Sequence, residues 1–269
     1  MGLVEDMKVL RYTLGRYKEF KKQKDYITWF YDERPGLFKF KDIHKGEDCF
    51  ILGNGPSLNK MDLIKLNDYY TFGLNKIFLI FKKVDLRLSY HVSVNKYVIE
   101  QSKDELLNLK CPKFLSYKGS NHILQYRDFY YLYTNGGVGG FQPNITNPLI
   151  ECGTVTYVAM QVAYYMGFQN VFLIGVDHNF KQSGRANEEQ VMAGPDLNHF
   201  DPNYFTGQKW NLADLKSSEF GYNQAKLWFE MNNRHIMDST LEGKLSIFKK
   251  LDFVEALKIA KKKNKTETN

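Results

Sequence analysis

The chain has 269 residues, of which 43% are hydrophobic, and this is enough to bury one sizeable core with short appendages. Its formal net charge of +7 could attract nucleic acid or anionic lipid, but the basic residues gather near the two ends and no nucleic-acid-binding motif accompanies them. No apolar run is long enough to cross a bilayer, and Met1 to Lys8 lack the apolar segment of a secretory signal. We therefore expect a cytoplasmic protein that does not bind nucleic acid.

Residues 1–47 are predicted to form an N-terminal helical extension that breaks at Pro35-Gly36. Basic side chains alternate there with aromatic ones such as Tyr17 and Trp29. A helix of this kind could rest on the inner face of an anionic membrane, which would make the protein peripherally membrane-associated. Packing on the main domain or on a second subunit is the favoured alternative, and we expect a homo-oligomer.

The predicted core, residues 48–257, opens with four strands, at 49–52, 70–74, 86–94 and 113–117. Residues 119–148, rich in Asn, Gly and aromatic residues, are predicted to form a mobile loop or lid. Its run Phe129 to Tyr133 suits either a carbohydrate or core packing. The cysteines Cys49, Cys111 and Cys152 have no metal-site spacing and are predicted to be buried free thiols.

The second half of the core repeats the alternation of helices and strands. Thr154 to Gly167 carries apolar residues at helical spacing, and 171–176 is a continuous apolar strand. A polar stretch, 177–214, precedes a helix at 215–232, a short strand at 235–237, a helix from Asp252 and a basic tail, 258–269. This order predicts an α/β, Rossmann-like fold with a mostly parallel sheet and helices on both faces.

The stretch Cys49-Phe-Ile-Leu-Gly-Asn-Gly-Pro-Ser-Leu58 is the strongest functional signal. An apolar strand runs directly into a turn where Gly53 and Gly55 allow positive φ and close approach of a ligand. Pro56 suits a first helical turn, and Ser57 offers a hydroxyl. We expect a nucleotide phosphate to bind Asn54, Ser57 and the exposed amides. The run lacks the Lys-Ser/Thr of a P-loop and the third glycine of a dinucleotide fingerprint.

Further polar residues follow other predicted strands. Asn75 ends the second strand, Asn95 follows the third, and Asp177-His178-Asn179 follow the strand at 171–176. In parallel sheets the carboxyl ends of the strands share one edge, so these side chains should converge there. Uncharged amides and hydroxyls at that edge could hold a phosphate or read a base and a sugar.

Four motifs resemble one superfamily: residues 50–58, 71–75, 153–167 and 171–177. One branch of that superfamily holds bacterial lipo-oligosaccharide sialyltransferases and flagellin nonulosonate transferases. The other branch is named for 6-hydroxymethylpterin diphosphokinase (MptE-like) and includes proteins of polysaccharide gene clusters. The sequences of residues 153–156 and 238–245 resemble this second branch more closely. The resemblance covers about 49–257.

In the sialyltransferases the glycine-rich turn and the asparagines hold CMP and the sugar. By motif, this resemblance implies nucleotide or substrate roles for the residues Gly53, Asn54, Gly55, Pro56, Ser57, Asn75 and Asn95. It implies the same for Thr154 and Thr156, which match a Thr-Ser-Gly run. Asn179 stands near the place of a tyrosine that helps the phosphate depart in that family, and we name Arg185, Tyr204 and Lys209 as substitutes.

Glycosyl transfer also needs a base for the acceptor hydroxyl. His199, in the long polar loop, is the candidate, with Asp201 or Asp177 as its orienting carboxylate. The alternative is that His199 and Asp201 only form a turn network around Pro202. No Asp-x-Asp pair occurs, so no metal site is predicted.

The sequence thus predicts a metal-independent transferase without cofactors that moves a nonulosonic or sialic-type sugar from CMP to a surface-glycan acceptor. The alternatives are a diphosphokinase acting on a pterin-like alcohol with Mg²⁺ and ATP, and a nucleotide-sugar-binding component without catalysis.

Overall fold

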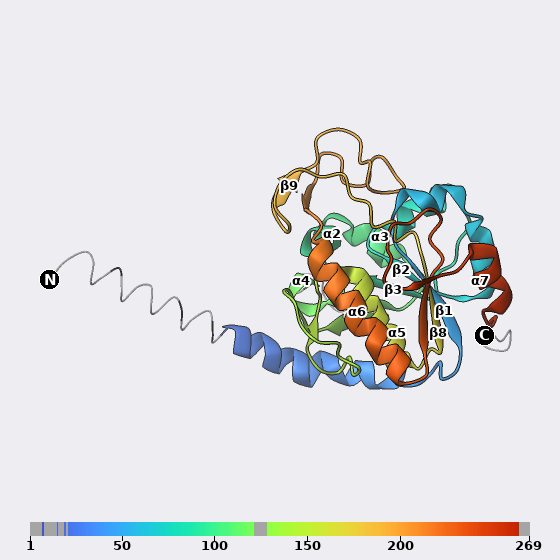
Figure 1. The fold of residues 1–269 in the computed structure, drawn as a ribbon. Helices are drawn as coiled ribbons and strands as arrows, with labels where there is room; N and C mark the ends of the chain where they lie inside the picture. The colour runs from blue at the N-terminus through green and yellow to red at the C-terminus, as the bar shows by residue number, and fades with distance from the viewer. Residues whose placement is uncertain (1–6, 8–14, 16–18, 20, 121–127, 264–269) are drawn as a thin grey trace.

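The computed structural model describes Met7, Gly15, Glu19 and the residues 21–120 and 128–263. Within these residues, eight strands form one sheet in the order β12-β11-β8-β1-β2-β3-β4-β5. Every neighbouring pair in it is parallel. Figure 1 shows the helices that cover this sheet. The predicted α/β, Rossmann-like fold is confirmed.

The strands of the sheet are β1 (Asp48–Leu52), β2 (Tyr70–Leu74), β3 (Tyr90–Ser93), β4 (Lys113–Ser116), β5 (Phe129–Leu132), β8 (Asn170–Ile174), β11 (His235–Asp238) and β12 (Lys249–Lys250). The α-helices are α2 (Lys96–Gln101), α3 (Lys103–Asn108), α4 (Tyr117–Ser120), α5 (Val155–Met166), α6 (Leu215–Met231) and α7 (Phe253–Ile259). Two small sheets pair β6 (Thr134–Asn135) with β7 (Leu149–Ile150) and β9 (Glu189–Val191) with β10 (Lys209–Asn211). The remaining turns are η1 (Trp29–Glu33), η2 (Arg34–Phe40), η3 (Pro56–Lys60), η4 (Leu63–Asp68) and η5 (Ile77–Lys82).

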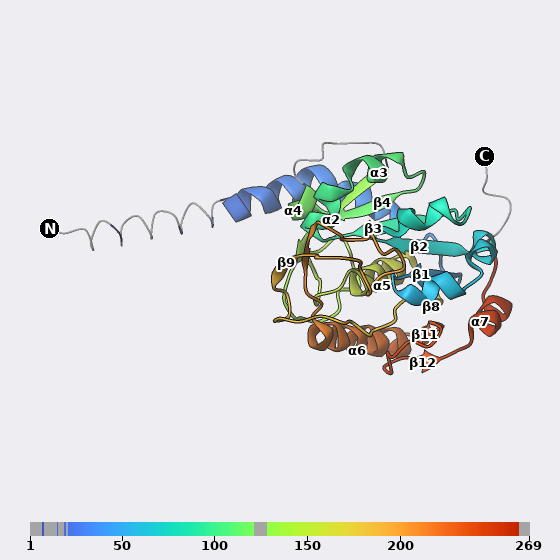
Figure 2. The ribbon, with the colours of Figure 1, turned by 90° about the horizontal axis from the view of Figure 1, so that it is seen from above.

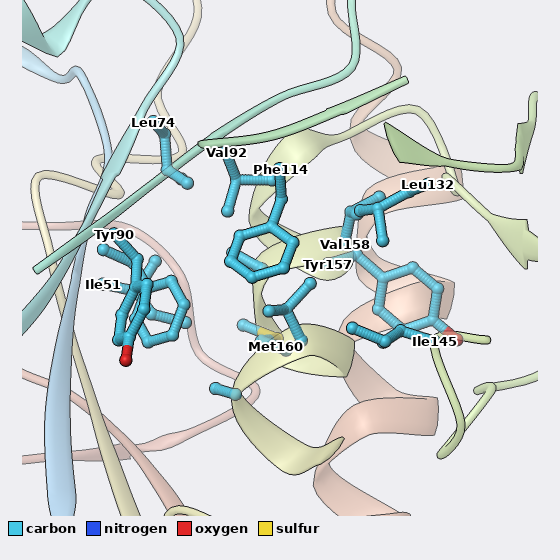
Figure 3. Close-up of a cluster of buried hydrophobic side chains, with 14 of the residues drawn as sticks. Ile51, Leu74, Tyr90, Val92, Phe114, Leu132, Ile145, Tyr157, Val158 and Met160 are labelled. Atoms are coloured by element: carbon cyan, nitrogen blue, oxygen red, sulfur yellow. The ribbon is translucent and has the colours of Figure 1, made fainter. Parts of the chain in front are cut away.

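Both faces of the sheet are covered, because the central strands β1, β2 and β3 are buried at every position and are mostly apolar. In β1, Cys49 and Ile51 belong to one hydrophobic cluster, whereas Phe50 and Leu52 belong to a second. This is the alternation that a strand imposes on successive side chains. Helix α5 fills the first cluster, as Figure 3 shows for Tyr157, Val158 and Met160 beside strand residues. The turns η3 and η4 and helix α7 close the second.

The N-terminal segment packs on the sheet where the structure describes it. Its helix changes type instead of breaking at Pro35-Gly36: a π turn, η1, passes directly into the 3-10 turn η2. Trp29 is fully buried and its Nε1 donates a hydrogen bond to the main-chain oxygen of Tyr131 at 2.7 Å. Figure 2 shows this segment along the β4 side of the sheet. Residues 29–40 are thus part of the core, while most of 1–20 lies outside the described residues.

The prediction of a loop over residues 119–148 is wrong in part. Residues 129–132 form β5, the edge strand beside β4, and Tyr131 and Leu132 are buried. The aromatic run therefore packs in the hydrophobic core, because alternate side chains of a strand point to the same face of the sheet. Residues 121–127 lie outside the described residues. The third strand is also shorter than predicted.

Several local predictions are confirmed. Helices α5 and α6 start and end within one or two residues of the predicted limits, and α7 starts one residue after its predicted start. Cys49, Cys111 and Cys152 are free and buried, which confirms the prediction of buried thiols. Across the described part of the chain, no helix combines the length and apolar character that a membrane span requires.

Candidate active site

A cavity of about 430 Å³ lies at the carboxyl ends of the strands, where β1 and β8 meet. The chain moves from β1 outward to β2 on one side and later returns to β8 on the other, so this is the topological switch point of the sheet. Folds of this class bind ligands at that point. The lining includes ten residues selected from the sequence: Gly53, Asn54, Gly55, Asn75, Asn95, Thr154, Thr156, Asp177, Asn179 and His199. Pro56, Ser57, Asp201 and Tyr204 are not among the lining residues.

The glycine turn after β1 is shaped by close contact with the end of β8. The amides of Gly53 and Gly55 donate to the carbonyls of Ile174 and Gly175, both at 2.8 Å. A Cβ on Gly53 would lie 2.3 Å from the oxygen of Gly175, and one on Gly55 would lie 1.7 Å from Oδ2 of Asp177. Neither glycine has a positive φ, contrary to the prediction. Glycine is required here because two strand ends approach each other.

Ser57 does not present its donors to a ligand, which corrects the prediction for this residue. Its amide donates to Oδ1 of Asp177 at 3.1 Å, and its hydroxyl donates to Oδ2 at 2.7 Å. The carboxylate thus occupies the start of η3, where the phosphate was expected. Burial raises the pKa of Asp177, and the bonds from Ser57 act in the opposite direction. Asp177 therefore holds the turn and is not the partner of His199.

His199 is held by a buried carboxylate that the sequence analysis did not select. Its Nδ1 donates to Oδ2 of Asp196 at 2.8 Å, and the Asp196 side chain is fully buried. The ring stacks on Tyr204 with centroids 4.0 Å apart and planes 5° apart. Nε2 of His199 has no hydrogen-bond partner among the described residues. A ring fixed on one nitrogen with a lone pair on the other is arranged as a general base.

Asp201 and Tyr204 have structural roles, which corrects both predictions. Asp201 accepts a hydrogen bond from the amide of Asn203 at 2.8 Å and, through its carbonyl, from the amide of Tyr204 at 3.0 Å. This is the local turn around Pro202 that the sequence analysis weighed as the alternative. Tyr204 is buried, and its hydroxyl accepts a bond from the amide of Lys76 at 3.0 Å. Its ring supports the His199 ring by stacking against one face of it.

The loop that carries His199 is tied to the glycine turn and to a buried lysine. The amide of Phe200 donates to the carbonyl of Asn54 at 2.9 Å. Nζ of Lys76 donates to the carbonyl of Tyr204 at 3.0 Å and to the side chains of Gln101 and Gln208. Burial lowers the pKa of Lys76 to about 8. The loop is therefore fixed on the sheet at two points.

The asparagines at the strand ends already use some of their polar groups in hydrogen bonds within the protein. Asn75 adopts φ +47°, and its carbonyl accepts a bond from Nε2 of His91 at 2.7 Å. Oδ1 of Asn95 caps α2 by accepting bonds from two main-chain amides. Nδ2 of Asn54 donates to the carbonyl of Leu74 at 3.0 Å, which engages one of its two N–H donors. Asn179 is exposed at the cavity.

The first turn of α5 supplies the most favourable place for an anion. Gly153, Thr154, Val155 and Thr156 line the cavity together. Thr154 caps the helix by accepting a bond from the amide of Thr156 at 3.2 Å. The unpaired amides and the dipole of this twelve-residue helix favour negative charge at its start. The predicted threonines thus line the cavity through the start of their helix.

Two lining residues were missed as site candidates by sequence reasoning. Nε2 of His178 pairs with Oε1 of Glu219 at 2.9 Å, and His178 has φ +53°. Its place directly after a strand was the available signal. Glu151 is half-buried, and burial raises its pKa. Nothing in the local sequence marks Glu151, because its position depends on the pairing of β6 with β7.

The charges of the lining are unusual for a nucleotide site. Its described residues include Glu151 and Asp177 but neither lysine nor arginine. Arg185 and Lys209, named as substitutes for a phosphate-binding tyrosine, are outside the lining, and Lys209 pairs with Glu189 at 2.8 Å. Within the described ranges, no cluster of three or more His, Cys, Asp or Glu side chains could hold a metal ion.

Comparison with known proteins identifies the family. A family described as 6-hydroxymethylpterin diphosphokinase MptE-like matches residues 28–183, which is more than half of the chain. The chain belongs to the MptE-like family. A search of curated proteins gave no significant match.

Two solved structures resemble this member of the MptE-like family. The MAf glycosyltransferase from Magnetospirillum magneticum AMB-1 has a TM-score of 0.51 and 14% identity over 84% of this chain. This chain covers only 38% of that protein. The second structure is the sialyltransferase CstII from Campylobacter jejuni in complex with a substrate analogue, cytidine-5'-monophosphate. It has a TM-score of 0.48 and 13% identity, and the match covers 82% of this chain and 91% of that chain. At such an identity the likeness to the MAf enzyme shows the fold alone.

Proposed function

We propose that this protein is a glycosyltransferase that moves a nonulosonic or sialic-type sugar from a CMP donor to a surface-glycan acceptor without a metal ion. The observation that carries the proposal is the His199–Asp196 pair, which faces a cavity at the switch point of the sheet. The fold shared with a glycosyltransferase and the motif resemblance support the same class of reaction.

In this reaction the bond between the anomeric carbon and the phosphate oxygen of CMP breaks, and a bond from the anomeric carbon to the acceptor oxygen forms. The proton of the acceptor hydroxyl passes to Nε2 of His199. Asp196 then stabilises the imidazolium, since its carboxylate already accepts the bond from Nδ1. The departing CMP phosphate would lie against the first turn of α5, whose amides favour the growing charge.

A lining without lysine or arginine fits the single phosphate of CMP better than the three phosphates of ATP. The single phosphate carries less charge than a triphosphate, and helix amides and hydroxyls can balance it. Transfer from ATP would need cations or Mg²⁺ ligands along three phosphates. The described lining offers two carboxylates, and that of Asp177 is engaged by Ser57.

The family description favours a second candidate, the diphosphokinase that acts on a pterin-like alcohol with Mg²⁺ and ATP. A thermal-shift panel of CMP, UDP, GDP and ATP, each with and without Mg²⁺, separates the two. A ligand at a hundredfold excess over its Kd stabilises the folded state by about 2.7 kcal/mol, which raises Tm by roughly 5 °C. A shift with CMP that needs no metal supports the transferase, and a shift with ATP only in the presence of Mg²⁺ supports the diphosphokinase.

Turnover is tested with CMP-N-acetylneuraminic acid and a mixture of glycan acceptors, with release of CMP as the readout. We expect His199→Gln to bind CMP as the wild type does and to lose release of CMP. His235→Gln is the matched control, because His235 is exposed at the start of β11 and is outside the lining of the cavity. Binding of CMP without release in the wild type would instead indicate a nucleotide-sugar-binding component without catalysis.

A further inference from the structure

A second hollow of about 370 Å³ lies next to the cavity along the same edge of the sheet. Its walls come from the ends of β3, β4 and β6. Asn95, Glu151 and Asn211 line both hollows, so the two lie side by side. A volume of this size is within the range of small-molecule sites. The hollow is called the side groove below.

The side groove differs from the cavity in charge. Lys96 and Lys118 line it, whereas the described lining of the cavity contains no lysine or arginine. Glu151 stands where the two meet. An anionic group would therefore be repelled at the junction and attracted farther along the groove.

Lys118 is the better placed of the two cations. Its Nζ donates to Oδ1 of Asn135 at 2.5 Å and lies 4.3 Å from the centroid of the Tyr133 ring. Both partners are uncharged, and Lys118 forms no salt bridge within the described residues. Lys96, in contrast, pairs with Glu100 at 3.5 Å. Partial burial lowers the pKa of Lys118, which means that its charge is incompletely solvated. The carboxylates of Glu151 and Asp25 attract Lys118 from a distance, but neither is in salt-bridge contact with it, so the oriented ammonium can bind an anion.

The ends of the neighbouring strands add hydroxyl groups to the floor of the side groove. The Thr134 hydroxyl donates to Oγ of Ser116 at 2.8 Å, and Oγ of Ser116 also accepts a bond from the amide of Gly119 at 3.3 Å. These groups fix the shape of the floor beneath Lys118. A sugar ring offers the matching hydroxyls, and an anionic substituent on it would reach the lysine.

We propose that the side groove is the acceptor site, and that it binds a sugar bearing a carboxylate or a phosphate through Lys118. This inference rests on the proposed function, because it takes the cavity as the donor site. The acceptor hydroxyl then enters the cavity past Glu151, and the anionic substituent fixes which hydroxyl does so.

The test uses the full chain saturated with CMP and titrated calorimetrically with sialyllactose, glucose 1-phosphate and neutral lactose. At least one anionic sugar should bind about fivefold or more tightly than lactose, the effect of roughly one partly desolvated ion pair. Comparing sialyllactose with glucose 1-phosphate tells a carboxylate from a phosphate preference. Lys118→Met should remove the preference and leave the Kd for CMP unchanged.

Lys258→Met is the matched control, since it removes the same charge from α7, which Figure 1 shows on the far side of the sheet from α4. It should keep the preference. Equal binding of lactose and both anionic sugars, or a preference that survives Lys118→Met, overturns the acceptor site while CMP binding upholds the donor site. Failure of the wild type to bind CMP overturns the donor site and this inference with it.

Discussion

The contact between Gly55 and Asp177 predicts a specific coupling between two substitutions. A methyl group at position 55 would lie 1.7 Å from Oδ2 of Asp177, so Gly55→Ala must displace the carboxylate. The displacement breaks its bonds with the amide and hydroxyl of Ser57. Hydrogen bonds to charged groups are worth about 1.5–3 kcal/mol each, and the lower end applies because burial opposes the charge of Asp177. We expect Gly55→Ala to lower the free energy of unfolding by about 3 kcal/mol.

Asp177→Ala removes the same two bonds but also removes the nearest obstacle to the new methyl group, which leaves a contact of 2.9 Å with the main-chain oxygen of Gly175. The double variant Gly55→Ala/Asp177→Ala should therefore be no less stable than Asp177→Ala by more than about 1 kcal/mol, which gives a coupling energy of about 2 kcal/mol. Gly53→Ala is the contrast: its methyl would lie 2.3 Å from the main-chain oxygen of Gly175, and trimming Asp177 cannot relieve that contact.

The assay is urea unfolding followed by circular dichroism, with free energies extrapolated linearly at a common m value. Additive effects of Gly55→Ala and Asp177→Ala would refute the reasoning, as would a Gly55→Ala variant of wild-type stability. Relief of Gly53→Ala by Asp177→Ala would show that the two strand ends are not in contact as described.

Three other predictions concern titration and the His199 loop. Burial lowers the pKa of His91 from 6.5 to about 4, so the contribution of the neutral ring to stability is complete above pH 6.5 and is lost as pH falls through 4. We expect the free energy of unfolding, measured in urea, to fall by about 3 kcal/mol between pH 7 and pH 4 for this reason. This part of the loss should be absent in His91→Gln. Asp196→Asn should lower CMP release about a hundredfold or more with unchanged CMP affinity, because His199 loses its orienting carboxylate; an unchanged rate would contradict the pairing. Lys76→Met should lower the free energy of unfolding by about 3 kcal/mol, since buried acceptors lose their donor. It should also accelerate amide hydrogen exchange over residues 196–208. Equal exchange in both proteins would contradict the role of Lys76 in holding this loop.

The apolar periodicity of single segments already determined much of the fold. β1 is apolar from Cys49 to Leu52, which predicts a strand buried on both faces, and α5 shows helical spacing between a threonine cap and a terminal glycine. These are local properties, so the sequence suffices to find them. β5 was missed because its aromatic residues stand beside Asn- and Gly-rich stretches, and only its pairing with β4 makes it a strand.

The outcome for the site differs from residue to residue. The glycine turn and Asn75 were found because residues after parallel strands must share one edge of the sheet, whereas Thr154 was found through the family resemblance. The pairing of His199 with Asp196 instead of Asp201 depends on the turn that the loop adopts, which residue types alone do not fix.

The sequence by itself determined the order of strands and helices, the edge of the sheet at which polar residues gather, and the family. Only the tertiary structure decided which donors remain available there. The amide and hydroxyl of Ser57 look free in the sequence, yet a carboxylate 120 residues away takes both. The physical reason is that buried donors must be satisfied within the fold, and the group that satisfies them comes from whichever strand end lies alongside.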